Sequence, residues 1–295
     1  LFSSDFNLTK RVFLKLKRFR IFLNEDIKGI SWTWLRVAAY KKNNWRRIIN
    51  LISFCIFVSF MVIFKIIKNR FKKNKILILA SSPQLPAAFV LFILSYLFRI
   101  KFVLEVRDLW PQVLIDNGSN KDSIIIRILF FMEMMLYDKA SAVVVLSKGV
   151  IKYIKKKGAK VVHWMPNGAD TDEFYYSNLP PEDNGFTEHR PFLIIYAGAH
   201  GESNDLSIVV EAAYLLKKEP IKFLLIGDGP EKENLIDKAK NLNNIEFRDP
   251  ISKKDMPLIL SQSDAILLCL KDLPLFRYGV SPNKLYDAYS SGRPI

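Results

Sequence analysis

The chain contains few of the residues that build metal centres and disulfide frameworks. It has 2 cysteines and 3 histidines in 295 residues. Cys55 and Cys269 lie far apart in apolar surroundings, so neither a disulfide scaffold nor a zinc site is expected, and a reducing cytosol fits best. No Asp-X-Asp motif stands at a convincing strand end. The sequence therefore favours chemistry without a metal or another cofactor.

Apolar runs long enough to cross a bilayer are also missing. The two longest, residues 51–64 and 85–98, are both shorter than the roughly 20 residues that a span needs. Each run fits a buried helix, an interfacial membrane helix or a short span. No signal peptide with a cleavage site is visible.

Acidic residues are in deficit. The chain has 44 Lys and Arg against 29 Asp and Glu, a formal net charge of +15, which calls for an acidic partner. The basic residues crowd into 10–20, 41–47 and 65–75, where they flank apolar runs. This pattern predicts a surface that sits on an anionic membrane. It argues against nucleic acid, whose binders interleave basic residues with exposed aromatics.

Strand and helix patterns alternate along most of the chain. Near-continuous aliphatic runs predict buried parallel strands at 75–80, 101–106 and 142–146. The pattern resumes with further strands predicted at 192–196, 222–226, 245–247 and 265–270. Helical patterns lie between or after them, at 87–98, 124–137, 207–217, 231–241, 254–262 and 282–290. The sequence therefore predicts an α/β fold of two Rossmann-like, doubly wound domains that face each other across a cleft.

The length of the chain also favours two domains. We place an N-terminal domain at 1–175 with its first strand missing, a linker at 176–190, and an incomplete C-terminal domain at 191–295. The chain opens at Leu1 and stops at Ile295, where a further apolar strand should begin. We therefore expect a fragment truncated at both ends.

Charged side chains emerge where the strand at 101–106 ends, which is where ligands of such sheets bind. Arg107 is suited to hold a phosphate or an acceptor oxygen, Asp108 to orient a sugar hydroxyl, and Trp110 to support a sugar ring. The alternative is an ion network of Arg107 with Asp108 or Glu105 that only stitches the loop.

Two hydroxyls end the preceding strand. Ser81 and Ser82 are suited either to cap the following helix or to contact a ligand. The later Pro-Asn-Gly segment at 166–168 is interpreted first as a turn and only second as a site.

Glycines follow two strands of the C-terminal half. Gly198 and Gly201 would permit close approach of a diphosphate, and His200 between them could donate to it, although a lone histidine is often structural. Gly227 opens a turn like those that cradle phosphates. It lacks the full G-x-G-x-x-G spacing, so a dinucleotide cofactor is only weakly indicated.

The final residues place a carboxylate on a helix that runs into a Gly-X-Pro turn. Asp287 could accept hydrogen bonds from ribose hydroxyls, while the helix N-terminus suits a diphosphate. Arg277 and Lys284 could neutralise that diphosphate without a metal. The alternatives are an ordinary capped helix and solvated surface charges.

Six motifs in this order resemble the bacterial glycosyltransferases of family 4, which have the GT-B fold, particularly the capsule and O-antigen branch. They are EVRDLWP at Glu105, VVVLSKGV at Val143, MPNGAD at Met165, YAGAHG at Tyr196, LLIGDGPE at Leu224 and PLFRYGVSPNKLYDAYSSGRPI from Pro274.

The resemblance implies a retaining, metal-independent transferase that moves a hexosyl or N-acetylhexosaminyl group from a UDP-sugar to a lipid-linked glycan. It implies donor binding by the C-terminal domain, acceptor binding by the N-terminal one, and a peripheral location on the cytoplasmic face of the bacterial inner membrane. A UDP-sugar epimerase of the same fold and a non-catalytic, membrane-bound sugar-binding subunit are the alternatives.

The resemblance also carries site residues. Asp287 matches the second acid of the family's E-x7-E motif, whereas the first falls at Gly279, so Ser281 or Asn283 would have to substitute. The expected catalytic residues are Arg107, Asp108 and Lys284. The expected donor-binding residues are Gly198, His200, Gly201, Gly227, Arg277, Ser281, Asn283, Lys284 and Asp287. The expected acceptor-side residues are Ser81, Ser82, Glu105 and Trp110.

Overall fold

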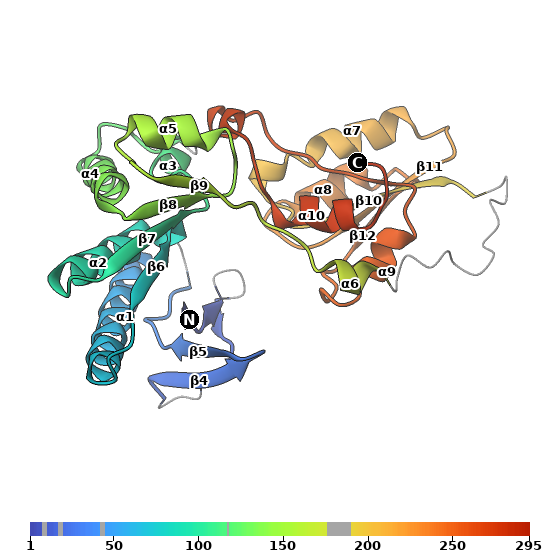
Figure 1. The fold of residues 1–295 in the computed structure, drawn as a ribbon. Coiled ribbons are helices and arrows are strands. Elements are labelled where there is room, and N and C mark those ends of the chain that lie inside the picture. The colour runs from blue at the N-terminus through green and yellow to red at the C-terminus, as the bar shows by residue number, and fades with distance from the viewer. Residues whose placement is uncertain (8–10, 17–19, 42–44, 117, 176–189) are drawn as a thin grey trace. The chain divides into compact units, whose positions relative to one another are not determined.

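The computed structural model describes the chain except residues 8–10, 17–19, 42–44, 117 and 176–189. The described residues form two compact units. One comprises Leu1–Met165 with Pro274–Gly279, and the other comprises Pro166–Leu273 with Val280–Ile295 (Figure 1). Each unit contains a parallel four-stranded sheet, so the predicted α/β class is confirmed.

The main sheet of the N-terminal unit has the strand order β6-β7-β8-β9, with all neighbours parallel. Its strands are β6 (Leu77–Ser81), β7 (Lys101–Val106), β8 (Ala142–Val145) and β9 (Val162–Trp164). Alternate aliphatic residues such as Ile78, Leu104 and Val145 are buried on one face and form the centre of the core. The strands predicted here are confirmed to within about two residues at their ends.

Helices supply the rest of this core. They are α1 (Trp45–Phe71), α2 (Leu85–Leu97), α3 (Gln112–Asp116), α4 (Ile124–Lys139) and α5 (Val150–Lys156), with a 3₁₀ turn η1 (Ser82–Gln84) before α2. The second apolar run of the sequence becomes α2, a mostly buried helix that contacts both α1 and α4. The first becomes part of α1, the one described helix that is long and apolar enough to cross a membrane.

The described residues among the first 35 form a small β structure that the sequence patterns did not predict. β1 (Phe2–Ser4), β4 (Phe22–Ile27) and β5 (Ile30–Leu35) make a sheet in the order β1-β5-β4, and β2 (Phe6–Asn7) pairs with β3 (Val12–Phe13). Lys28 and Gly29, both at positive φ, form the two-residue turn between β4 and β5. Two left-handed residues match the twist of an antiparallel hairpin, which explains the glycine.

The sheet of the C-terminal unit has the order β12-β11-β10-β13, again all parallel. Its strands are β10 (Phe192–Ala197), β11 (Ile221–Ile226), β12 (Ile245–Arg248) and β13 (Ala265–Ile266). The helices are α6 (Thr171–Tyr175), α7 (Ser207–Leu215), α8 (Lys232–Ala239), α9 (Met256–Ser261) and α10 (Asn283–Ser290), with a 3₁₀ turn η2 (Glu202–Asn204).

Both faces of this second sheet are covered. One core cluster joins Tyr196 and Phe223 to residues of α7 and α8, and another joins Ile195 to residues of α6, α9 and α10. Helices on both faces of a parallel sheet make a doubly wound domain, as the alternation of patterns predicts.

The division into units differs from the expected one at two places. α6 belongs to the C-terminal unit, because Phe174 is buried in its core. The 3₁₀ turn η3 (Pro274–Tyr278) belongs to the N-terminal unit, because the Leu275 amide donates to Asp116 and the Tyr278 carbonyl accepts from Ser147. All but the last residue of the expected linker at 176–190 lies outside the described residues.

Candidate active site

Two loops meet at the carboxyl edge of the C-terminal sheet, one after β10 and one after β11. The Gly198 amide donates to the Ile226 carbonyl at 2.9 Å, and the His200 amide donates to the Asp228 carbonyl at 2.9 Å. A Cβ on Gly227, whose φ is +152°, would lie 1.8 Å from the Gly198 carbonyl oxygen. The loops are thus in backbone contact, and glycine is required for that approach.

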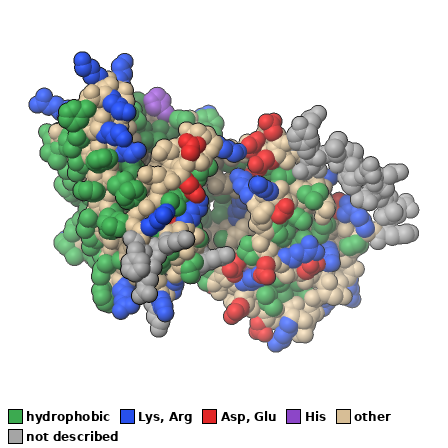
Figure 2. Space-filling model, turned by 90° about the horizontal axis from the view of Figure 1, so that it is seen from below, with side chains coloured by type: hydrophobic (Ala, Val, Ile, Leu, Met, Phe, Trp, Pro, Cys, Tyr) green, Lys and Arg blue, Asp and Glu red, His purple; other side chains and the backbone are tan. Residues whose placement is uncertain are grey.

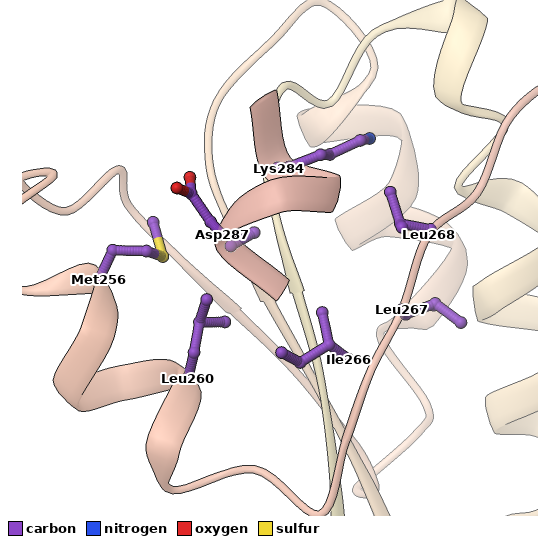
Figure 3. A pocket seen from close by; sticks show the side chains of 8 residues that line it. Met256, Leu260, Ile266, Leu267, Leu268, Lys284 and Asp287 are labelled. Atoms are coloured by element: carbon purple, nitrogen blue, oxygen red, sulfur yellow. The ribbon is translucent and has the colours of Figure 1, made fainter. Parts of the chain in front are cut away.

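Two pockets adjoin these loops. The first, which we call the Gly227 pocket, has a volume of about 280 Å³ and is lined by Gly198, Ala199, Ile226, Gly227, Asp228, Pro250, Ile251 and Met256. The second, the Asp287 pocket, has a volume of about 30 Å³ and is lined by Ala197, Met256, Leu260, Ile266, Leu267, Leu268, Lys284 and Asp287 (Figure 3). Met256 lines both, so the two pockets are neighbours.

Asp287 brings an unused acceptor to the Asp287 pocket. Its Oδ1 atom is buried and has no hydrogen-bond partner among the described residues, and the Lys253 ammonium lies 4.0 Å away. Burial raises the pKa of the Asp287 carboxyl; Lys253 lowers it and Glu173 raises it. A buried oxygen without a donor is costly, so this position gains from a ligand hydroxyl.

Lys284 leaves α10 on another side than Asp287 (Figure 3). Its ammonium donates to Asn204 Oδ1 at 2.6 Å and to Tyr196 Oη at 3.2 Å. Burial lowers the pKa of Lys284 to about 8, against a smaller opposing effect of Cys269. In the described part of the chain its polar partners are an amide and a phenol, which leave the positive charge uncompensated and suited to an anion.

His200 does not line either pocket. Its side chain is fully buried, and neither ring nitrogen has a hydrogen-bond partner among the described residues. The ring packs near Tyr196 and against the ring of Phe247, at centroid distances of 6.0 and 6.1 Å. Burial lowers the pKa of His200, Lys232 lowers it further and Asp228 opposes the shift. The structure supports a packing role beneath the loops, not the expected contact with a diphosphate.

The other residues expected to bind the nucleotide-sugar donor lie in different surroundings. Ser281 is bonded to Tyr286 Oη at 2.8 Å, and its carbonyl accepts from Asn167, so it ties the Pro-Asn-Gly turn to the start of α10. Asn283 is exposed at the first residue of α10. Gly201 has open space around it, since a Cβ would come no closer than 4.0 Å to Asn204. Arg277 lies in η3 and hence in the N-terminal unit, unlike Lys284.

Gly279 has a physical reason to lack a carboxylate. Its φ is +90°, and a Cβ there would lie 2.3 Å from the Ser147 hydroxyl. Both residues belong to the N-terminal unit. An L side chain at this position would be strained by the backbone and by Ser147 together.

The expected acceptor residues follow the strands of the N-terminal sheet. The buried Ser82 hydroxyl accepts from the Arg107 amide and donates to the Asp108 carbonyl, both at 3.1 Å. Ser82 therefore positions that loop. Ser81 Oγ and Gln84 Oε1 are buried without partners, and no side-chain hydrogen bond caps η1 or α2, so the capping alternative is wrong in the described residues.

The charged loop after β7 is not closed by ion pairs. Within the described residues no salt bridge joins Arg107 to Asp108 or Glu105, so the stitching network is absent. Desolvation raises the pKa of Asp108, and Arg107 lowers it. Glu105 lies opposite Ser81 in the β6–β7 register, and Trp110 packs against the core at a cis peptide bond with Pro111.

Several pocket residues were not singled out from the sequence. Tyr196 and Asn204 hold Lys284, and Pro250, Ile251 and Met256 line the Gly227 pocket. Pro250 and Ile251 follow β12, so the strand-end rule applied elsewhere would have found them. Met256 carries no such signal. Among the described residues there is no group of three or more His, Cys, Asp or Glu that could hold a metal.

Comparison with known proteins identifies relatives of the segment that holds the site. The sequence pattern of glycosyl transferases group 1 matches residues 191–295, the segment that holds both pockets. The matched segment contains Gly198, Gly227, Lys284 and Asp287, all of which line its pockets.

Two curated proteins are similar in sequence. The chain is 26% identical over 252 residues to a probable glycosyltransferase, WbjE, of Pseudomonas aeruginosa, covering 81% of this chain and 61% of that protein. It is 35% identical over 81 residues to WcaI, a putative colanic acid biosynthesis glycosyl transferase of Escherichia coli strain K12, covering 27% and 20%. The chain thus spans about three fifths of the first relative and a fifth of the second.

Solved structures share the fold. Anabaena HepE in complex with UDP and glucose matches with a TM-score of 0.60 at 15% identity, covering 90% of this chain and 66% of that one. WaaG, a glycosyltransferase involved in lipopolysaccharide biosynthesis, matches with a TM-score of 0.56 at 14% identity, covering 89% and 67%. These likenesses confirm the two-domain GT-B architecture.

Proposed function

We propose that the protein is a retaining, metal-independent glycosyltransferase. It moves a hexosyl or N-acetylhexosaminyl group from a UDP-sugar to a lipid-linked glycan in cell-surface polysaccharide synthesis. The observation that carries this proposal concerns two residues of α10, in the segment that matches glycosyl transferases group 1. Among the described residues, Lys284 is a half-buried cation without a carboxylate partner, and Asp287 has a buried acceptor atom, Oδ1, without a donor.

The nucleotide-sugar donor would supply a partner to both Lys284 and Asp287. The diphosphate accepts from the Lys284 ammonium and lies at the N-terminus of α10, where the helix dipole is positive. The ribose hydroxyls donate to Asp287 Oδ1. The nucleoside enters the Gly227 pocket, whose glycines allow a planar group to approach the backbone.

Departure of the diphosphate is the step that these residues assist. As the bond from the sugar to the phosphate oxygen breaks, negative charge grows on the diphosphate, and a cation that is not neutralised by a protein carboxylate stabilises it most. We propose that the acceptor hydroxyl then attacks the face from which the diphosphate leaves, so that the configuration of the sugar is retained.

The acceptor contacts the loops after β6 and β7. Ser81 Oγ and Gln84 Oε1 are unpaired, and the raised pKa of Asp108 brings that carboxyl closer to the range of a proton acceptor. Arg107 is exposed there without a salt bridge to Asp108 or Glu105 in the described residues, which suits the phosphate of a lipid-linked acceptor. The related proteins named for colanic acid and lipopolysaccharide synthesis support a glycan acceptor.

The test is a transfer assay with the full protein. A panel of UDP-sugars and a lipid-diphosphate acceptor is incubated with the protein, and products are identified by mass spectrometry. A product heavier by one sugar, with anomeric configuration kept, is expected. Lys284→Ala and Asp287→Ala should each reduce turnover at least 10-fold, and unchanged turnover in both would overturn the site.

A non-catalytic sugar-binding subunit is the second candidate, favoured by Gly279. The backbone there and the nearby Ser147 leave no room for the family's first acid. In that case calorimetry would detect UDP-sugar binding, whereas no acceptor would be extended. An epimerase would convert the UDP-sugar without any acceptor, and the same assay would detect its product.

A further inference from the structure

Helix α1 has two apolar sides, and only one is packed. Val58, Val62 and Ile66 are buried in the core of the N-terminal unit. On the other side Ile52, Ile56, Phe60 and Phe64 follow one another at four-residue intervals and are 51%, 61%, 69% and 57% exposed. Such spacing keeps these side chains on one stripe of the helix, which we call the α1 stripe.

Neighbouring helices add apolar surface. Tyr96 and Leu97 at the end of α2 are exposed, and so are Ile124, Ile125 and Phe131 of α4. α2 contacts both α1 and α4. Figure 2 shows hydrophobic side chains gathered over the N-terminal unit, with Lys and Arg side chains beside them. A soluble surface rarely keeps so many large apolar groups together unless they bind something.

The charges around this surface have one sign. Every charged residue between Ile27 and Leu104 is a Lys or an Arg. Arg46 and Arg47 are exposed where α1 begins, and Lys68, Lys72 and Lys73 are exposed where it ends. Apolar side chains bordered by cations are complementary to acyl chains beneath anionic headgroups.

We propose that the α1 stripe, with the exposed apolar residues of α2 and α4, docks on an anionic phospholipid bilayer, with α1 lying in the plane of the interface. Crossing the bilayer would require α1 to leave the core that holds Val58, Val62 and Ile66. It would also break the hydrogen bond from Asn50 to the Ala38 carbonyl at 2.6 Å. The proposal gives a surface to the membrane location that the proposed function implies.

The test measures binding of the purified protein to vesicles without any donor. Vesicles of phosphatidylcholine alone are compared with vesicles that also contain phosphatidylglycerol. We expect the protein to sediment with the anionic vesicles, and Ile56→Glu with Phe60→Glu to lower the bound fraction at least 10-fold. Leu215→Glu is the matched control, because Leu215 is also a large apolar residue exposed on a helix, 78% accessible, but lies in the C-terminal unit.

The contribution of the lysines at the end of α1 is tested with separate variants. Lys68→Gln, Lys72→Gln and Lys73→Gln together should weaken binding to the anionic vesicles about as strongly as raised salt does, because each removes attraction to the headgroups. Equal binding to neutral and anionic vesicles would overturn the choice of an anionic bilayer. Unchanged binding of the Ile56→Glu, Phe60→Glu variant would overturn the docking surface.

Two further measurements distinguish in-plane docking on a bilayer from a membrane span and from a contact between copies of the chain. Alkaline carbonate should release a protein that lies in the interface, and retention would overturn the in-plane orientation. If the stripe is instead a contact between copies, sedimentation velocity would show a dimer that the double variant dissociates, with no vesicle binding. The UDP affinity of the double variant is expected to be unchanged, which would show that the variant is folded. A protein that binds the vesicles but does not transfer sugar would contradict the proposed function and leave the docking surface intact.

Discussion

The ammonium group of Lys284 lies 4.6 Å from the ring centroid of Tyr196 and donates to the phenol oxygen of the same residue. Tyr196 Oη in turn donates to the Ala199 carbonyl at 2.7 Å. The first turn of α10 is thereby coupled to the loop after β10. The coupling leaves the positive charge of Lys284 in a partly desolvated place, where it costs stability without a ligand and favours binding of an anion.

Replacing Lys284 should separate binding from stability. Lys284→Met is expected to weaken UDP binding roughly 30-fold, about 2 kcal/mol, because a charged hydrogen bond to the diphosphate is lost. The free energy of unfolding of the unliganded protein should stay the same or rise by on the order of 1 kcal/mol, after allowance for solvent screening. Calorimetry and thermal unfolding measure the two quantities. Lys240→Met, which changes an exposed lysine of the same unit, should alter neither.

UDP affinity should depend on pH in the alkaline range. Because burial lowers the pKa of Lys284 to about 8, the cation is lost as pH rises through that value, and affinity should fall. Stability should move the other way. The unfolded chain binds the Lys284 proton up to its usual pKa near 10.5, so between about 8 and 10.5 this residue makes the free energy of unfolding rise with pH. Lys284→Met should abolish both dependences, and an unchanged affinity profile in that variant would contradict the assignment.

Asp287 should discriminate ribose from deoxyribose. The wild-type protein is expected to bind UDP about 10-fold more tightly than 2′-deoxy-UDP, since a hydroxyl that pairs with a buried acceptor is worth about 1.4 kcal/mol. Asp287→Ala, which removes the acceptor oxygens, should reduce that ratio to near one. The comparison of the two ligands within each variant corrects for any general loss of affinity.

Asp287→Asn, which removes the charge of the side chain, should raise the free energy of unfolding at neutral pH. Burial raises the folded-state pKa of Asp287, so its contribution is favourable below the unfolded value of 3.8 and is lost as pH rises through the folded value. Asp287→Asn should therefore unfold at a higher denaturant concentration than the wild type at neutral pH. Asp237→Asn, at an exposed position, serves as the control.

The contact between the two glycine loops should tolerate no side chain. Gly227→Ala would place a methyl group 1.8 Å from the Gly198 carbonyl oxygen, so we expect a loss of roughly 3 kcal/mol or more in the free energy of unfolding. Denaturant unfolding followed by circular dichroism measures it. Gly168→Ala, where nothing lies within 4 Å of the added Cβ, should stay within about 0.5 kcal/mol. Equal losses in both would mean that the loops separate easily.

Local patterns were sufficient for the elements on which the site stands. The runs that become β10 and β11 are almost wholly apolar, and Gly198 and Gly227 follow directly. A strand buried on both faces needs such a run, and a parallel strand must leave its sheet by a loop at the carboxyl edge. Both requirements are visible within a few residues, so the fold class and the positions of Lys284 and Asp287 on a helix could be predicted.

Long-range contacts decided the rest. His200, flanked by glycines, has the local appearance of a ligand, yet Tyr196 and Phe247 enclose its ring. Ser281 is engaged by Asn167, more than a hundred residues earlier. The segment Pro274–Gly279 joins the N-terminal unit because Asp116 and Ser147 bond to it.

By itself, the order of apolar and polar residues determined a chain of alternating strands and helices, with glycines and charges at the strand ends and a basic, apolar N-terminal third. Only the tertiary structure decided which of those side chains are left without a counter-charge or a hydrogen-bond partner among the described residues. The reason is physical. Periodicity is a property of neighbours along the chain, whereas solvation and hydrogen bonding depend on every group that folding brings into contact.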